Sequence, residues 1–200
     1  MTRILWVLLS AAAALAAPVA LGAGDPTEGK QKAESCGGCH GPDGNGAAPI
    51  FPKLAGQHAS YLTKQLHDFK TEKRPEPTMT AMALALSDDD MADIGAFYAA
   101  QAVQVEAAQE NELGRTIYRA GDPQRGVPAC TGCHGPEAKG NEPAGYPALR
   151  GQYAAYLSKT LHDFKGKARY NDTNEMMRVV AAHLTDEEIT GLSEYIAGLR

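Results

Sequence analysis

The chain has 200 residues, of which 44% are hydrophobic and only 6% aromatic, and its 19 basic and 24 acidic side chains give a net charge of −5. This length suits one large domain or two small ones. The negative charge argues against nucleic-acid binding and against attraction to anionic membrane surfaces, because both need a basic face.

Residues 1–22 have the composition of a secretory signal. A single charge at Arg3 precedes an apolar run that begins at Ile4 and continues into an alanine-rich tract, with small residues around Gly22. We expect cleavage after Gly22, with Ala23 as the second choice, and a periplasmic mature protein. The alternative is an uncleaved membrane anchor, for which the apolar run is near the lower length limit.

The first half of the mature chain predicts two helices separated by a loop. A cap followed by proline and an acidic first turn predicts a short helix that begins at Asp25 and runs into Cys36. Residues 41–46 contain three glycines, a proline, an aspartate and an asparagine, so they predict a loop. An apolar stripe at helical spacing then predicts a helix over residues 58–70.

A Cys-x-x-Cys-His motif occurs twice, at residues 36–40 and 130–134, and uses all four cysteines. Residues three apart on a helical turn put both sulfurs on one face, where each can form a thioether with a haem vinyl group, and the histidine points at the iron. A zinc half-site or a redox dithiol would need only the cysteines, so the repeated histidine disfavours both. The expected thioether residues are Cys36, Cys39, Cys130 and Cys133, and the expected axial ligands are His40 and His134.

The two motifs belong to a longer internal repeat. Residues 51–70 match residues 146–165 at a constant offset of 95, and a helix-start signal at residues 87–88 matches 185–186 at an offset of 98. The repeat predicts two all-α domains of the same plan, residues 23–105 and 106–200, each with a helix before the motif, one after the haem loop and one at its end. We expect the second domain to open with a helix over residues 107–119.

The repeat also selects a second axial ligand for each iron. At the offset of 98, the one methionine pair that recurs is Met79 with Met177. A low-spin electron-transfer haem usually has methionine or histidine there, so this pair is expected to complete the two sites. Met91 is expected in a helix core, whereas Met82 and Met176 can pack on the haem as flexible apolar groups.

The alternative is bis-histidine ligation by His67 and His162, which recur as well. On its predicted helix, His67 lies away from the apolar stripe, so a surface role is favoured. The recurring Pro52 and Pro147 are candidates for the carbonyl groups that must accept the axial imidazole N–H, although a tight turn would explain them equally well.

The two motifs, the paired stretches 51–57 and 146–152, the pair Met79 and Met177, and the ending over residues 192–199 together resemble the cytochrome c4 family. This resemblance covers essentially the whole mature chain. It implies two class I cytochrome c domains related by a pseudo-twofold axis, with two covalently bound c-type haems edge to edge. In the second ligand loop Met176 and Met177 are adjacent, which leaves a one-residue ambiguity in that ligand.

The resemblance further implies an electron carrier and not an enzyme. The implied partners are a bc1-type complex or another periplasmic donor and a haem-copper oxidase as acceptor, at a membrane face. Two other functions stay open at this point. One is a di-haem acceptor subunit of a larger dehydrogenase, such as a flavocytochrome, and the other is a di-haem peroxidase, which would need an open coordination position.

Overall fold

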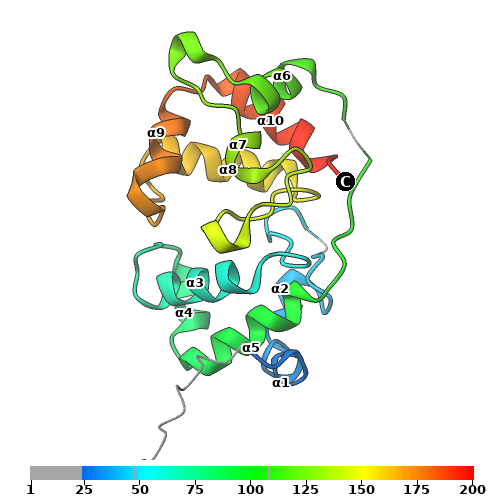
Figure 1. Ribbon diagram of the computed structural model, residues 1–200. Helices are drawn as coiled ribbons and strands as arrows, with labels where there is room; N and C mark the ends of the chain where they lie inside the picture. Colours follow the sequence, from blue (N-terminus) through cyan, green and yellow to red (C-terminus); the bar gives the residue numbers. More distant parts are fainter. Residues whose placement is uncertain (1–23, 47, 108) are drawn as a thin grey trace, which may run out of the picture.

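The computed structural model describes residues 24–46, 48–107 and 109–200, so the expected signal segment lies outside the described residues. In the described part the chain forms helices and turns, and its extended pairing is limited to isolated bridges at Asp122–Val127 and Asn141–Tyr146. The helices form two stacked bodies, one built from the first half of the chain and one from the second (Figure 1). The expected all-α fold with two domains is therefore correct.

The first domain contains five helices. They are α1 (Pro26–Lys32), α2 (Gly37–His40), α3 (Ala59–Lys70), α4 (Pro77–Ala83) and α5 (Asp88–Ala99). Helix α1 begins as predicted, because the Asp25 side chain accepts the Thr27 N–H, but it ends at Lys32 and a turn leads to Cys36. Helix α3 begins within one residue of the prediction.

The second domain repeats this order with three short 3₁₀ turns inserted. Its α-helices are α6 (Glu112–Ala120), α7 (Thr131–His134), α8 (Ala154–Lys165), α9 (Met176–Ala182) and α10 (Asp186–Ala197), and its 3₁₀ turns are η1 (Pro123–Arg125), η2 (Glu142–Ala144) and η3 (Thr173–Glu175). The prediction of a helix over residues 107–119 placed its start too early, because α6 begins at Glu112. Asn111 caps α6 by accepting the Gly114 N–H, so the chain before it is free to act as a linker.

In each domain the first and last helices cross at a glycine. A methyl group at Gly29 in α1 would lie 2.0 Å from the Asp93 carbonyl oxygen of α5, and one at Gly114 in α6 would lie 1.9 Å from the Gly191 carbonyl oxygen of α10. No side chain fits at either crossing, because the obstacle is helix backbone. The two crossings hold the chain ends of each domain together.

We expect Gly114→Ala to lower the free energy of unfolding by about 1–3 kcal/mol, because the backbone of α10 would have to move away from the added methyl group. Denaturant unfolding of the haem-loaded protein measures this loss. Arg115→Ala is the matched control, since it removes an exposed ion pair with Glu112 on the same helix, and it should change the free energy of unfolding by less than about 0.5 kcal/mol. Equal stability of the two variants would contradict the tight crossing.

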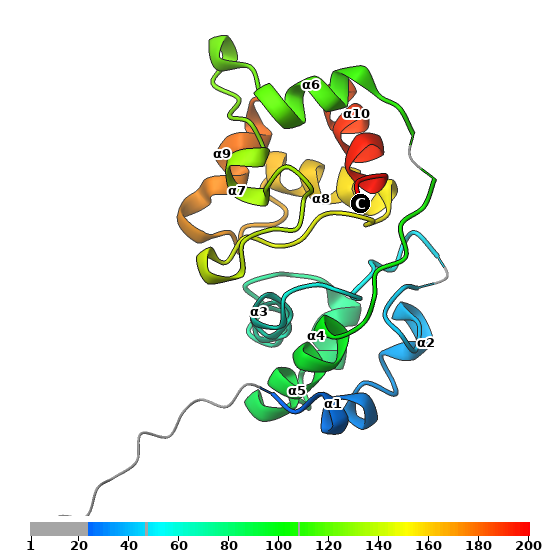
Figure 2. The same cartoon turned by 45° about the vertical axis from the view of Figure 1, so that its right-hand side comes forward.

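An arginine–tyrosine contact between the domains occurs in two copies, as expected for a pseudo-twofold axis. Arg74 of the first domain donates to the Tyr156 hydroxyl of the second over 2.7 Å, and Arg169 of the second donates to the Tyr61 hydroxyl of the first over 2.9 Å. The two arginines are 95 residues apart in the sequence, and so are the two tyrosines, which is the offset of the internal repeat. The α3 side of the lower domain therefore faces the second domain in a symmetrical way (Figure 2).

The linker between α5 and α6 runs along one side of both domains (Figure 1). It is fixed to the first domain by Asn45, whose amide donates to the Ala102 carbonyl over 3.0 Å and accepts the Gln104 N–H over 2.7 Å. Lys53 adds a bond to the Gln104 carbonyl at 2.6 Å. The start of the linker is therefore part of the folded body of the first domain.

Candidate functional site

Both Cys-x-x-Cys-His motifs form single helical turns, α2 and α7. Cys36 and Cys130 are half-buried and pack against the cores of their domains, while Cys39 and Cys133 are exposed. Burial raises the pKa of the Cys130 thiol to about 11, so it does not resemble the acidic thiol of a reactive dithiol. Each turn therefore presents one sulfur against the core and one at the surface.

The motif histidines are buried and held in one orientation. His40 Nδ1 lies 2.8 Å from the Pro52 carbonyl oxygen, and His134 Nδ1 lies 2.9 Å from the Pro147 carbonyl oxygen. A carbonyl can only accept, so Nδ1 carries the proton and Nε2 keeps its lone pair for a metal. Burial lowers the pKa of both histidines, against the opposing effect of these hydrogen bonds, so both rings are neutral at pH 7.

The recurring methionines lie in the first turn of a short helix in each domain. Met79 is half-buried against the first core, and its N–H donates over 2.7 Å to the side chain of Glu76, which caps α4. Met177 is also half-buried, at the second position of α9. Both therefore occupy corresponding places, after the loop that follows α3 or α8, as the repeat predicted.

Comparison with known proteins agrees with this duplicated site. The Cytochrome c family model matches residues 26–99 and again residues 112–200. Cytochrome c4 of Azotobacter vinelandii is 48% identical over 88% of this chain and 90% of its own length. The crystal structure of reduced recombinant cytochrome c4 from Pseudomonas stutzeri superposes with a TM-score of 0.87 at 45% identity, covering 89% of this chain and all of that one. The chain belongs to the cytochrome c4 family.

Some relatives of lower sequence identity are named for thiosulfate dehydrogenase. The thiosulfate dehydrogenase electron acceptor of Stutzerimonas stutzeri is 37% identical over 84% of this chain and 80% of its own length. A structure of thiosulfate dehydrogenase TsdBA from Marichromatium purpuratum matches with a TM-score of 0.78 at 31% identity, covering 86% of this chain and 40% of that chain.

As a cytochrome c4, the chain binds two covalently attached c-type haems and is an electron carrier, not an enzyme. The residues fit this group in both domains, because each motif turn offers two sulfurs and a histidine whose Nε2 is free to bind metal. When bound, haem supplies the one-electron couple of its iron. The protein contributes the orientation of the imidazole, the apolar core beside the half-buried cysteine and the protonation state of Nδ1.

The alternative histidines lie on solvent-facing positions. His67 is exposed on α3, and His162 is exposed on α8 with its Nδ1 at 2.9 Å from the Ser158 carbonyl oxygen of its own helix. This placement favours the surface role over bis-histidine ligation. No group of three or more histidine, cysteine, aspartate or glutamate side chains suited to a metal ion occurs in the described residues.

Of the other methionines, Met91 lies in a helix core as the sequence indicated. Met91 is fully buried in the first core, while Met82 and Met176 are 42% and 37% exposed. Met176 lies against Tyr146, whose hydroxyl is 3.9 Å from its sulfur. Met79 and Met177 remain the predicted axial ligands, and Met176 is adjacent to Met177 in the sequence.

Two residues that contact the sites indirectly were not predicted from the sequence. Gln57 and Gln152 recur at the offset of 95, yet nothing about a glutamine in a loop indicates a partner. In the structure each one binds the backbone of the opposite domain, directly beside the proline that holds the axial histidine. Their strict recurrence within the repeat was the one signal that could have identified them.

Proposed function

We propose that this cytochrome c4 acts in the periplasm and passes single electrons from a bc1-type complex, or from a periplasmic dehydrogenase, to a haem-copper terminal oxidase. Signal cleavage after Gly22 would leave two domains, residues 23–105 and 106–200, joined near Glu106. The axial pairs would be His40 with Met79 and His134 with Met177. An association with the membrane face would be peripheral, and in the described residues no helix is long and apolar enough to cross a bilayer.

The observation that carries this proposal is the matched pair of buried histidines, with a half-buried methionine in the first turn of the corresponding short helix of each domain. An iron with two protein axial ligands has no position for substrate, so it exchanges electrons without binding a small molecule. The same arrangement in both domains supports a carrier over a di-haem peroxidase, which needs one haem to open a coordination position.

Carbon monoxide tests whether both sites are closed. We expect the fully reduced native protein to bind no carbon monoxide at either haem, because a ligand would first have to displace methionine. Absorption spectra before and after exposure measure this. Binding at one haem of the native protein would contradict the carrier and favour the peroxidase.

Rapid oxidation of the reduced protein by a haem-copper oxidase, and rapid reduction by a bc1-type complex, would support the named partners.

The second candidate is a di-haem acceptor bound to a larger dehydrogenase, such as a flavocytochrome or a thiosulfate-oxidising enzyme. It is favoured by the relatives named as thiosulfate dehydrogenase electron acceptors and by the TsdBA structure. Cytochrome c4 relatives are more similar, at 47–48% identity against 37% and 32%. Affinity purification at native expression level decides between them, because a subunit would be recovered with its dehydrogenase in fixed ratio and a free carrier would not.

A further inference from the structure

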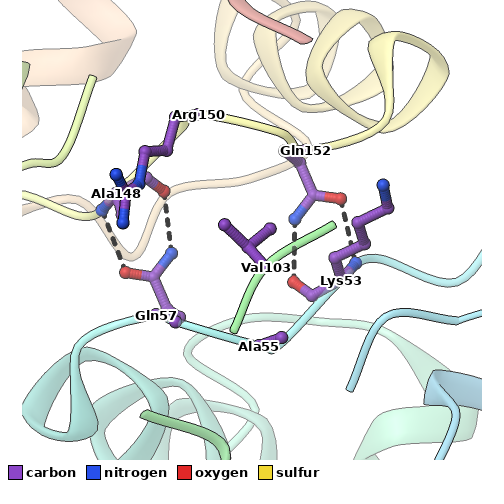
Figure 3. Close-up of a pocket in the computed structure, with 8 residues that line it drawn as sticks. Lys53, Ala55, Gln57, Val103, Ala148, Arg150 and Gln152 are labelled. Atoms are coloured by element: carbon purple, nitrogen blue, oxygen red, sulfur yellow. Dashed lines mark hydrogen bonds between the residues drawn. The ribbon is translucent and has the colours of Figure 1, made fainter. Parts of the chain in front are cut away.

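Two glutamines exchange hydrogen bonds across the domain boundary in a reciprocal manner (Figure 3). Gln57 accepts the Ala148 N–H over 3.0 Å and donates to the Ala148 carbonyl over 2.8 Å. Gln152 accepts the Lys53 N–H over 2.9 Å and donates to the Lys53 carbonyl over 2.8 Å. Each domain therefore offers one carboxamide to one backbone residue of the other.

The backbone residues that they bind are adjacent to the two prolines that hold the axial histidines. The Pro52 carbonyl and the Lys53 N–H are opposite ends of a single peptide group, and so are the Pro147 carbonyl and the Ala148 N–H. One end of each peptide accepts from an axial histidine, and the other end donates to a glutamine of the opposite domain.

The glutamine orientations are fixed by further contacts. The Gln57 Oε1 also accepts the His58 N–H, and the Gln152 Oε1 also accepts the Tyr153 N–H, each at 3.0 Å. Two N–H donors converging on one atom identify it as the oxygen. Val103 of the linker lies between the two carboxamides, and the four bonds that they make across the boundary are part-buried (Figure 3).

We propose that each glutamine sets the reduction potential of the haem in the opposite domain, by polarising the peptide that accepts the axial histidine N–H. Hydrogen bonds in a chain strengthen one another, so an acceptor on the peptide N–H makes the proline carbonyl a stronger acceptor. A stronger acceptor gives the imidazole more anionic character, which favours ferric iron and lowers the potential. Gln57 acts on the haem held by His134, and Gln152 on the haem held by His40.

This inference rests on the proposed histidine ligation and gives the two domains a direct chemical link. Each axial histidine is linked in this way to one glutamine of the opposite domain, so the loss of one glutamine acts mainly on one haem. The glutamines are positioning residues, because they reach the haem sites only through a peptide and an imidazole.

Gln57→Leu tests the proposal in the haem-loaded protein. We expect the equilibrium constant for reduction of the second haem to increase about three- to tenfold, which for a one-electron couple raises its potential by about 28–59 mV. The potential of the first haem should change much less. Potentiometric titration measures both, with the haems assigned through Met79→His and Met177→His variants. Proton NMR of the ferrous protein should show the His134 Nδ1–H moving upfield while that of His40 stays.

The matched control is Ser60→Ala, which removes a different bond across the same boundary, from Ser60 Oγ to Glu142 over 3.0 Å. It should leave both potentials unchanged. Gln57→Glu keeps an acceptor and adds charge, so it should lower the second potential, and Gln152→Leu should raise the first. Equal shifts of both haems in Gln57→Leu, or the same shifts in Ser60→Ala, would overturn the proposal and indicate a loosened boundary. A native protein without two six-coordinate haems would instead refute the ligand assignment.

Discussion

Replacing Cys130 and Cys133 together by alanine is expected to leave one covalently bound haem in each chain. Without either sulfur the second domain cannot form a thioether, and the His134 imidazole alone holds haem only reversibly. The first domain is unaffected, because Cys36 and Cys39 lie on a separate helical turn in a separate core. Haem per chain, measured as the pyridine complex after acid extraction of loose haem, should fall by about half.

The mirror variant, with Cys36 and Cys39 replaced by alanine, provides the control. It should lose the same amount of haem from the other domain, and both variants should keep the spectrum of the remaining site. Haem stain retained at full intensity in either variant would show that the cysteines are not the attachment points. Loss of both haems from one variant would show that the domains cannot fold independently of each other.

Helix starts and the duplicated plan were predictable because they depend on short stretches of chain. Ser87 and Thr185 each form a capping box with the acidic residue three positions later, at the places where the sequence indicated helix starts. The two motif turns are set by local spacing. Local features of this kind occur in both halves of the chain, so each half alone is enough to predict them.

Contacts between distant parts of the chain could not be predicted in the same way. The cores illustrate this, since each contains one fully buried tyrosine on a different helix, Tyr98 on α5 and Tyr118 on α6. The core cluster that contains Tyr98 also contains the small Ala33, the residue after α1, and the cluster that contains Tyr118 also contains Ile196 of α10. The exchange of large and small residues preserves the packing but removes the match from the repeat.

The loop before α9 shows why the repeat offset changes from 95 to 98. Asn174 and Glu175 both have left-handed backbone angles, with φ of 53° and 61°. Asp172 closes the loop by accepting from the Arg178 N–H over 3.0 Å and from its Nε over 2.8 Å. The spacing of apolar residues that indicates helices or strands does not reveal this loop, because the loop depends on an ion pair between two residues that are six positions apart in the sequence. It fixes where Met176 and Met177 enter the helix.

Met177→Ala is expected to remove about half of the far-red sulfur-to-iron absorbance of the oxidised protein, since one of two methionine ligands is lost. Reduced protein should then bind carbon monoxide at one haem, and the potential of that haem should fall, because methionine ligation favours ferrous iron. Absorption spectroscopy and potentiometric titration measure the three effects. The first haem should be unchanged in all of them.

Met176→Ala is the matched variant, because adjacent helical residues point about 100° apart and only one can reach a given iron. Met176 is 37% exposed and its sulfur lies against the Tyr146 hydroxyl, whereas Met177 is half-buried. We therefore expect Met176→Ala to keep the full far-red absorbance and to bind no carbon monoxide. The reverse result, with the band lost in Met176→Ala and kept in Met177→Ala, would move the ligand by one residue, and retention in both variants would reopen ligation by His162.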